Sequence, residues 1–214
     1  MTLRLGVLCS GEGTNLSAVL SACAEGAIDA AVALVLCNRP GAPCLGRAER
    51  AGVPSLTLDH RAFPDRAAYD LALAAALREA SVDLVVLAGF MRIVGPGLLD
   101  AFPDRVLNVH PSLLPAFPGV DAIGQALAHG AQITGCTVHL VDTGTDTGPI
   151  VAQSAIVIAP DDTRETLGAR LHPIEHRTLV DAIGLFSRGA VQVVRSTGRP
   201  RVVAPGEARG RVFP

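Results

Sequence analysis

Short apolar runs alternate with longer amphipathic segments along the first half of the chain, and this alternation limits the choice of fold more than any other feature. The apolar runs predict strands buried on both faces, and they are Leu3–Cys9, Ala31–Cys37, Leu84–Ala88 and Val106–Val109. The segments between them have helical spacing, and they are Leu16–Glu25, Pro43–Ala51 and Ala67–Glu79. Strands and helices that alternate in this way predict a Rossmann-like α/β fold, with a mostly parallel sheet and helices on both faces.

The second half of the chain follows a different pattern, which predicts antiparallel pairing. Thr134–Val141 and Ile150–Ile158 are expected to be strands, because each is an apolar run bounded by turn residues. The loop Asp142–Pro149 would join them as a hairpin connection. A helix is expected before this pair, at Ile123–His129.

A long helix is predicted to follow the antiparallel pair. Thr163 has the character of an N-cap, and the helical pattern after it extends toward Ser187. Pro173 lies inside this pattern, so we expect a kink or a restart of the helix there.

The chain carries no linker or repeat that would divide it into two large domains, so we expect one domain over residues 1–195. Residues 196–214 would form a C-terminal extension. Val191–Val194 and Arg201–Val203 are predicted to pair as a late hairpin, and the Gly-, Pro- and Arg-rich tail after Pro205 is predicted to be disordered.

Composition disfavours several classes of function. The 214 residues are 49% hydrophobic and 18% charged, which suits a folded domain with a sizeable core. The net charge of −2, without a basic cluster, disfavours a nucleic-acid partner. No lysine occurs, so neither a lysine Schiff base nor a P-loop lysine is available.

The cysteines and the N-terminus indicate an ordinary cytoplasmic protein. The five cysteines have irregular spacing and no C-x-x-C pair, so we expect neither a metal site nor a disulfide framework. The N-terminal apolar run that ends at Cys9 is too short for a signal sequence or a membrane span. We therefore expect reduced core thiols and no membrane partner.

The first motif with chemical meaning is Ser10–Asn15, a glycine-containing loop between a predicted strand and helix. Glycines let the backbone approach a ligand, and the start of a helix offers free N–H groups to an anion. A dinucleotide-binding loop is disfavoured, because Leu16 stands where a third glycine is needed and Asn38-Arg39 stands where an acidic residue is needed. The loop favours a phosphomonoester site over a simple turn with an N-cap.

A stronger signal comes from Asn108–Pro115, at the end of the Val106–Val109 strand. Asn108 and His110 are two residues apart, so their side chains project to the same face of the strand. The carboxyl end of such a strand is where open α/β sheets bind ligands. An amide and an imidazole there could donate hydrogen bonds to a developing oxyanion, although an isolated Asn-x-His is more often part of a turn.

The loop Asp142–Pro149 supplies a carboxylate, Asp146, that would orient and charge a histidine if it lies nearby. The competing interpretation is a solvated hairpin tip, which Asp, Thr and Gly commonly form. Weaker signals are Gly89–Val94, an apolar loop with one arginine that could wall a flat ligand, and Glu175-His176 on the late helix. The remaining histidines are interpreted as bystanders, and they are His60, His129, His139, His172 and His176.

Four segments have the order and spacing of a known family, and they are Ser10–Asn15, Ala88–Arg92, Asn108–Pro115 and Asp146–Pro149. On these segments, and over residues from about Leu3 to about Val194, the chain resembles the phosphoribosylglycinamide formyltransferase family of folate-dependent enzymes. The resemblance implies a single-domain formyltransferase fold, with a nucleotide-binding half over about 1–105 and a catalytic and folate-binding half over about 106–195. It also implies formyl transfer from 10-formyltetrahydrofolate to the glycyl amine of a ribonucleotide in purine synthesis.

The resemblance also implies the roles of individual residues. The residues that match the family's catalytic trio are Asn108, His110 and Asp146. The residues that match the ribonucleotide site are Gly13, Thr14, Asn15, Gly89, His172 and Glu175. The residues that match the folate site are Arg66, Met91, Arg92, Ile93, Val94, Asn108, Asp142, Thr143, Gly144, Thr145 and Asp146. The protein is further expected to act on small-molecule substrates and to bind neither a metal nor a nucleic acid. It is expected to be a cytoplasmic monomer or homodimer.

The chain departs from the family pattern at Glu12, at Ala116 and over Gly119–Ala122. These departures concern contacts made by loops and leave the trio intact. Three rival functions are disfavoured, of which a deformylase and a nucleotide-binding module are kept as alternatives. A transfer-RNA formyltransferase is expected to carry a basic C-terminal domain, and a formyltetrahydrofolate deformylase an N-terminal regulatory domain. A non-catalytic nucleotide-binding module would explain the Gly11–Asn15 loop but would give the trio no purpose.

Overall fold

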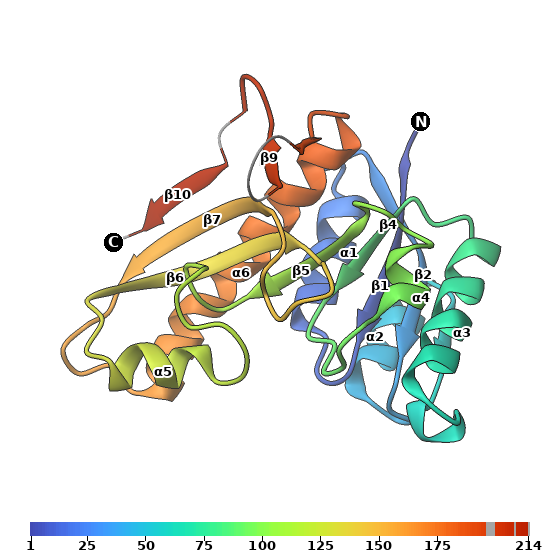
Figure 1. The fold of residues 1–214 in the computed structure, drawn as a ribbon, viewed down its shortest axis with the longest axis horizontal. Helices are drawn as coiled ribbons and strands as arrows, with labels where there is room; N and C mark the ends of the chain where they lie inside the picture. The colour runs from blue at the N-terminus through green and yellow to red at the C-terminus, as the bar shows by residue number, and fades with distance from the viewer. Residues whose placement is uncertain (196–199, 208, 214) are drawn as a thin grey trace. The chain divides into compact units, whose positions relative to one another are not determined.

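The computed structural model describes residues 1–195, 200–207 and 209–213, and the chain divides into two compact units. The first unit is Met1–Asn108 and the second is Val109–Pro214. Figure 1 shows the order of the helices and strands along the chain. Among the described residues, no helix combines the length and the apolar character that a membrane crossing requires.

The first unit is a parallel sheet with strand order β3-β2-β1-β4-β5. Its strands are β1 (Leu3–Cys9), β2 (Ala30–Cys37), β3 (Ser55–Thr57), β4 (Leu84–Leu87) and the start of β5 (Val106–His110). Its helices are α1 (Thr14–Ala24), α2 (Pro43–Arg50), the 3-10 turn η1 (His60–Ala62), α3 (Arg66–Glu79) and α4 (Pro96–Leu99). The boundary between the units falls within β5.

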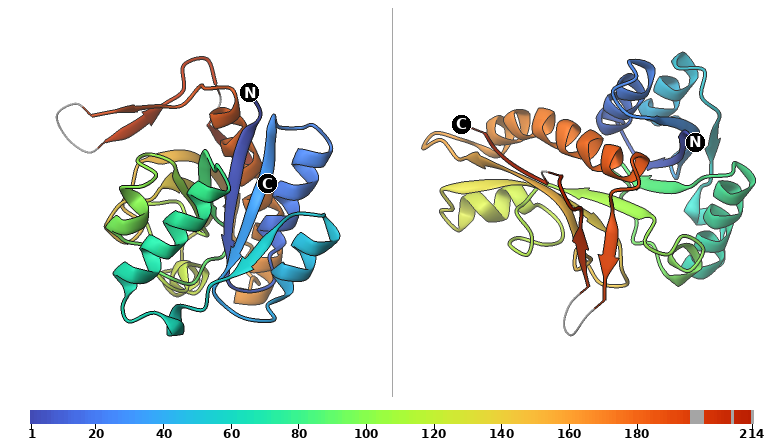
Figure 2. Two further views of the ribbon diagram at one scale, coloured as in Figure 1. Left: turned by 90° about the vertical axis from the view of Figure 1, so that its right-hand side faces the viewer. Right: turned by 90° about the horizontal axis from the view of Figure 1, so that it is seen from above.

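Helices cover both faces of this sheet, with α1 and α2 on one side and α3 and α4 on the other (Figure 2). The strand side chains are therefore buried on both faces, as Val7, Leu8, Val85 and Val86 show with no exposed surface. Burial on both faces explains why these strands are continuous apolar runs rather than alternating ones. The parallel α/β pattern predicted from the first half is confirmed.

The second unit contains α5 (Ala122–Ala128), β6 (Ile133–Leu140), β7 (Ile150–Val157), α6 (Arg164–Ser187), β8 (Gln192–Val194), β9 (Arg201–Val203) and β10 (Gly210–Phe213). The end of β5 neighbours β6 in the sheet, and β6 pairs antiparallel with β7. A register shift between Val138 and His139 marks a bulge close to the loop that connects these two strands. The hairpin β8–β9 forms a separate two-stranded sheet.

Helix α6 is uninterrupted from Arg164 to Ser187, so the predicted restart at Pro173 is wrong. Pro173 removes one helical N–H, which leaves the carbonyl of Ala169 without its usual partner. Both residues lie on the exposed side of the helix, where water can satisfy that carbonyl. The opposite side of α6 is buried against β6 and β7, and this packing keeps the helix continuous.

The tail is a second correction, because residues 210–213 form β10 rather than a disordered end. Strand β10 pairs in parallel with β7. Phe213 packs against the buried cluster of Cys136, Ile156, Leu171 and Ile174. The side chain of one aromatic residue therefore anchors a segment whose Gly-, Pro- and Arg-rich composition predicted fraying. Residues 196–199, 208 and 214 of the predicted extension lie outside the described residues.

Candidate active site

The strongest candidate site lies at the carboxyl end of β5. His110 is the last residue of this strand and is 5% exposed. Asn108 precedes it by two residues and is half-buried. The alternation of side chains along a strand directs both toward the same face, as the sequence predicts.

Asp146 lies between two histidines of the second unit. Its Oδ2 is 3.3 Å from Nδ1 of His110, and its Oδ1 is 3.5 Å from Nε2 of His139. The structure therefore joins His110 to Asp146, two of the three residues in the predicted trio. It also shows that His139, which the sequence indicated as a bystander, contacts the same carboxylate.

Each of the two histidine rings faces hydrogen-bond acceptors on both sides. Nε2 of His110 is 2.8 Å from the carbonyl oxygen of Phe117, and Nδ1 of His139 is 2.9 Å from the carbonyl oxygen of Leu140. A neutral imidazole can donate from only one nitrogen, whereas an imidazolium donates from both. Each ring therefore has an oxygen atom beside both of its nitrogens.

The surroundings of Asp146 hold it as a carboxylate. Partial burial by itself would raise its pKa, but a hydrogen bond from His139 and one from the backbone N–H of Gly119 act in the opposite direction. The positive charges of His110 and His139 add to this, and the pKa of Asp146 falls below its ordinary value. The Gly119 N–H donates to Oδ2 over 2.8 Å.

Backbone conformation and local hydrogen bonds shape the loop that carries Asp146. Asp146 itself has φ of 54°, in the left-handed region that an Asp side chain tolerates better than most. A Cβ atom at Gly148 would overlap the carbonyl oxygen of Leu140, so only glycine fits there. Asp142 accepts hydrogen bonds from the Gly144 N–H and the Thr147 hydroxyl, at 3.0 and 2.7 Å, and these close the loop on itself. Thr143, Gly144 and Thr145 at its tip are exposed.

In the first unit, the predicted phosphate loop has the geometry of an anion site. Gly13 is the N-cap of α1 with φ of 72°, and Thr14 and Asn15 are the first residues of that helix. Glycine has no side chain with which to cap the helix, so the first N–H groups of α1 can meet an anion together with the positive end of the helix dipole. The Arg47 side chain supports the loop by donating to the Glu12 carbonyl over 2.6 Å.

The loop after β4 is attached to the phosphate loop within the same unit. The Ser10 N–H donates to the carbonyl of Gly89 over 3.2 Å, and the Met91 N–H donates to the Ser10 hydroxyl over 2.8 Å. Gly89 has φ of 71°, which allows the sharp turn that brings these segments together. Gly89, one of the residues predicted to bind the ribonucleotide, therefore lies beside the loop that carries Gly13, Thr14 and Asn15.

The predicted folate loop presents apolar side chains to the surface. Met91 is 67% exposed and Ile93 is 63% exposed, whereas Val94 is buried at 3%. Arg92 is also exposed. The end of the loop is held by Asp70, a residue of α3 with 1% exposure that accepts from the Gly95 N–H over 2.8 Å. Arg66, at the start of α3, lies close to Gly95.

The last two predicted ribonucleotide residues are on α6 in the second unit. His172 is exposed, and Glu175 is 8% exposed. Burial raises the pKa of Glu175 to about 7. A carboxyl group that changes charge near neutral pH is suited to a binding or catalytic role.

Sequence reasoning missed three contacts of Asp146 and His110, and they come from His139, Phe117 and Gly119. Two of them involve backbone atoms, which leave no signal in residue type. The signal for His139 was its position, because it lies one residue before the end of β6 and therefore near the base of the loop that carries Asp146.

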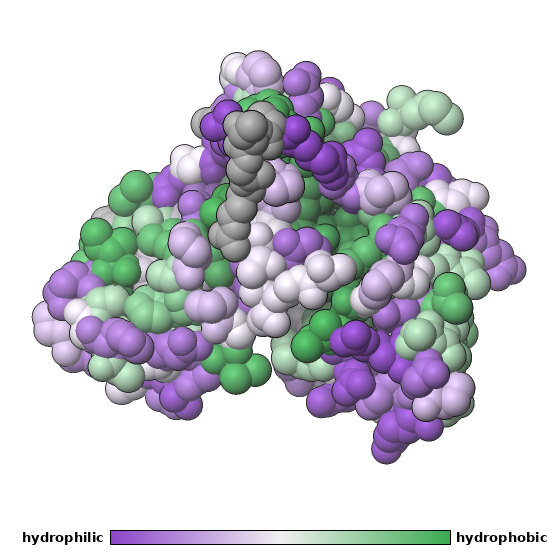
Figure 3. All heavy atoms as spheres, viewed as in Figure 1, coloured by the Kyte–Doolittle hydropathy of each residue, from purple (hydrophilic) through white to green (hydrophobic). Residues whose placement is uncertain are grey.

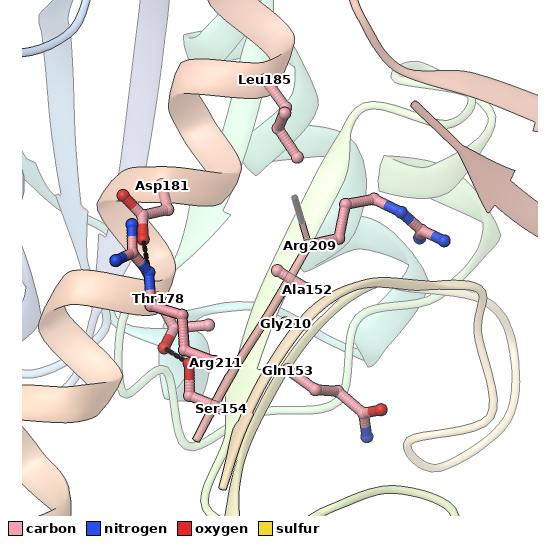
Figure 4. Close-up of a pocket in the computed structure, with 9 residues that line it drawn as sticks. All are labelled: Ala152, Gln153, Ser154, Thr178, Asp181, Leu185, Arg209, Gly210 and Arg211. Atoms are coloured by element: carbon pink, nitrogen blue, oxygen red, sulfur yellow. Dashed lines mark hydrogen bonds and ion pairs between the residues drawn. The ribbon is translucent and has the colours of Figure 1, made fainter. Parts of the chain in front are cut away.

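A small cavity in the second unit is lined by none of the predicted site residues (Figure 4). Its volume is about 20 Å³, which is room for about one water molecule. An ion pair between Arg211 and Asp181 and a hydrogen bond between Thr178 and Ser154 lie at its wall. Both hydrophobic and hydrophilic side chains reach the surface on the face that Figure 3 shows. Ile133, at the start of β6, and Val157, at the end of β7, are among the exposed hydrophobic residues.

Comparisons with known proteins identify the family of this chain. The model of the formyl transferase family matches residues 3–183. A phosphoribosylglycinamide formyltransferase of Mycobacterium tuberculosis is 46% identical over 194 residues, which are 91% of this chain and 89% of that protein. The protein of the same name from Bacillus subtilis is 43% identical over 190 residues, which are 87% of this chain and 97% of that protein.

Solved structures give the same result. The crystal structure of glycinamide ribonucleotide transformylase 1 from Symbiobacterium toebii is 50% identical to this chain and has a TM-score of 0.90. The match covers 94% of each chain. The family match spans most of the chain and includes His110, His139 and Asp146. This chain is a member of the formyl transferase family.

Proposed function

We propose that this chain is an enzyme that transfers a formyl group from 10-formyltetrahydrofolate to the glycyl amine of N1-(5-phospho-D-ribosyl)glycinamide, a step of purine synthesis. The observation that carries the proposal is the contact of His110 with Asp146 at the end of β5, over 3.3 Å. The relatives with 43% and 46% identity support the choice of substrate, since both are named for it.

In this proposal, Asn108 and His110 donate hydrogen bonds to the oxygen that gains negative charge when the amine adds to the formyl carbon. Asp146 acts on His110 by favouring its doubly protonated form, and His139 holds Asp146 from the other side. An oxyanion donor of this kind is worth about 10²–10³ in turnover. The amine must also lose a proton, and the His110–Asp146 pair provides a route for it.

The Phe117 carbonyl bears on this mechanism, because it lies 2.8 Å from the Nε2 atom of His110. A substrate oxygen that accepts from Nε2 must share this N–H with the carbonyl or displace it. Phe117 has φ of 54° and Gly119 has φ of 80°, so the chain turns tightly over this segment. We propose that the segment moves when substrate binds.

The ribonucleotide is proposed to bind through its phosphate and its ribose. Gly13, Thr14 and Asn15 would receive the phosphate at the start of α1, with Gly89 beside them. Glu175 and His172 would bind the ribose hydroxyls, since a buried carboxylate is a strong acceptor for a hydroxyl group.

The folate would supply the formyl group, carried on a nitrogen that leaves as an amine. The apolar side chains of Met91 and Ile93 fit such a ligand, because a flat ring system needs apolar walls. Both side chains are exposed and could therefore contact it. The loop residues Asp142–Asp146 would contact the same ligand. Holding both substrates in line would save on the order of 7–11 kcal/mol of the barrier.

We further propose that residues 1–195 act as one formyltransferase domain, with the remaining residues as an extension. A cytoplasmic location and a monomeric or homodimeric state are part of the same proposal. The low net charge of −2 argues against a nucleic-acid substrate.

The direct test is to mix the purified full chain with glycinamide ribonucleotide and a 10-formyl folate and to follow the absorbance change of the folate. The expected result is folate turnover that requires the ribonucleotide and yields the formylated ribonucleotide. Free formate without the ribonucleotide would indicate a deformylase instead. Binding of the ribonucleotide without turnover would indicate a nucleotide-binding module.

A further inference from the structure

Three cysteines of the first unit lie together although they are far apart in the sequence. Cys9 ends β1, Cys37 ends β2 and Cys44 is the second residue of α2. Their sulfur atoms all lie within 4.8 Å of one another, and the sulfurs of Cys37 and Cys44 are 3.6 Å apart. All three side chains are buried, with at most 1% exposure. None of them has a role in the proposed formyl transfer.

We propose that these three thiols form a binding site for a single Cu(I) ion. A metal about 2.3 Å from each of three sulfurs in a plane requires sulfurs about 4 Å apart. The observed sulfur positions meet this requirement with small movements. Thiolate sulfur is a soft ligand, and soft ligands select Cu(I) over hard cations such as Mg²⁺ or Ca²⁺.

The number of ligands favours copper over zinc. Among the described residues, the cluster contains the three cysteines and no fourth His, Cys, Asp or Glu. Structural zinc sites almost always have four protein ligands in a tetrahedral arrangement. Cu(I) is stable with three sulfur ligands, so the cluster as it stands is complete for Cu(I) and incomplete for zinc.

Cys44 lies near the positive end of the α2 helix dipole. This residue lies in the first turn of α2, whose N-cap Ala42 offers no capping side chain. Each thiol that binds the metal releases its proton to solvent, so one Cu(I) with three thiolates carries a net charge of −2.

An ion can reach the cluster through the segment between β2 and α2. Residues 39–41 of this segment are exposed and contain Gly41 with φ of 72°, while Cys37 and Cys44 flank it. Opening of this short segment would uncover two of the three sulfurs. The site also adjoins the phosphate loop, because the Cys44 N–H donates to the Gly11 carbonyl over 3.1 Å and a Cβ at Gly13 would lie 2.7 Å from Cys44 Cβ.

The test is an anaerobic titration of the reduced full chain with Cu(I) in competition with a chromophoric Cu(I) chelator. The expected result is one Cu(I) per chain, with three sulfur neighbours in X-ray absorption spectra. Cys9→Ala, Cys37→Ala and Cys44→Ala should each weaken binding by more than about 100-fold. Such a loss exceeds the roughly 10–100-fold loss of affinity caused by replacing a residue that only hydrogen-bonds to a metal ligand.

Cys136→Ala is the matched control, because Cys136 is 0% exposed but lies in the second unit. Its copper affinity should equal that of the unsubstituted chain, and circular dichroism establishes that each variant folds. Failure to bind one Cu(I), nitrogen or oxygen neighbours around the metal, or an equal loss in Cys136→Ala would overturn the proposal. So would a Cys37–Cys44 disulfide in place of metal binding. These readouts do not depend on formyl transfer, so they stand or fall separately from the proposed function.

Discussion

At the scale of single residues, Asp146 brings together parts of the second unit that are distant in the sequence. It accepts from the Gly119 N–H and lies against His110 on one side and His139 on the other. Each of these groups favours the carboxylate over the neutral acid, and together they outweigh the cost of burial. We therefore propose a positioning role for His139, separate from that of the residues that would contact the substrate.

Replacement of His139 should change the pH dependence of the reaction. After burial, which raises the pKa of Asp146, the hydrogen bond from His139 is the largest influence on that pKa and lowers it. In His139→Phe the pKa of Asp146 should rise, so the acid limb of the kcat/KM profile should move to higher pH. His139→Gln keeps an N–H donor and should restore most of the original profile. An acid limb that is the same in all three proteins would contradict the positioning role.

Glu175 should make ribonucleotide affinity depend on pH near neutrality. Burial raises its pKa to about 7, so it is neutral at low pH and a carboxylate at high pH. Only the carboxylate is a strong acceptor for ribose hydroxyls, so the affinity should increase between pH 6 and pH 8. Calorimetry on Glu175→Gln should show a smaller increase, with only the titration of the ligand phosphate remaining. Equal pH dependence in both proteins would exclude Glu175 from the ribose site.

Glu175 should also affect the stability of the protein. Its folded-state pKa is raised from 4.5 to about 7, so its contribution to stability is fully present below pH 4.5 and is lost as the pH rises through 7. The loss corresponds to at most about 3 kcal/mol. The free energy of unfolding of Glu175→Gln minus that of the unsubstituted chain should therefore be larger at pH 8 than at pH 5. Urea unfolding of both proteins at both pH values measures this difference. If the difference is the same at pH 5 and pH 8, burial does not raise the pKa of Glu175.

At the scale of elements, the loop between β6 and β7 positions the carboxylate of Asp146. Gly148 allows the loop to pass close to the Leu140 carbonyl, and a Cβ there would force the two apart. Gly148→Ala should therefore displace Asp146 from His110 and lower kcat by about 10²-fold, the cost of a misplacement of about 1 Å. The secondary structure should remain intact by circular dichroism.

Gly168→Ala is the control for this substitution. Gly168 is in the middle of α6, and its added Cβ would meet only Ile123 at 3.7 Å, an ordinary contact. Turnover should be unchanged, and stability should increase by about 0.5–1 kcal/mol because alanine favours a helix interior. Normal turnover in Gly148→Ala would show that the loop does not depend on this close approach.

The elements with a clear hydrophobic pattern could be predicted from the sequence, including the late hairpin of β8 and β9, whereas β3, α4 and β10 could not. Strand β1 has the predicted bounds, and β2, β4, α1, α2 and α3 each have bounds within two residues of the prediction, because their hydrophobic patterns are long. Strand β3 and helix α4 were not predicted, because β3 buries none of its three residues and α4 has only four residues. Strand β10 depends on the packing of Phe213 against a distant core, which no local pattern reveals.

At the scale of the whole molecule, the site depends on contacts between residues that no local rule connects. The resemblance to a family predicted that Asp146 belongs with His110, and the structure confirms the contact. His139 and the backbone groups of Phe117 and Gly119 were not predicted, because the bulge in β6–β7 and the turns at 117–119 arise only in the folded chain. The cysteine cluster escaped prediction for the same reason, since positions 9, 37 and 44 form no motif.

The measurement that tests the account most directly is a double-mutant cycle on His110 and Asp146 in single-turnover formyl transfer to glycinamide ribonucleotide. If the two residues act as one unit, His110→Ala and Asp146→Asn should each lower the rate by about 10²–10³, and the double variant should be little slower than either single one. Single variants with near-normal rates would contradict the account. A double variant whose loss equals the product of the single losses would also contradict it, because the contact between His110 and Asp146 would then have no part in the reaction.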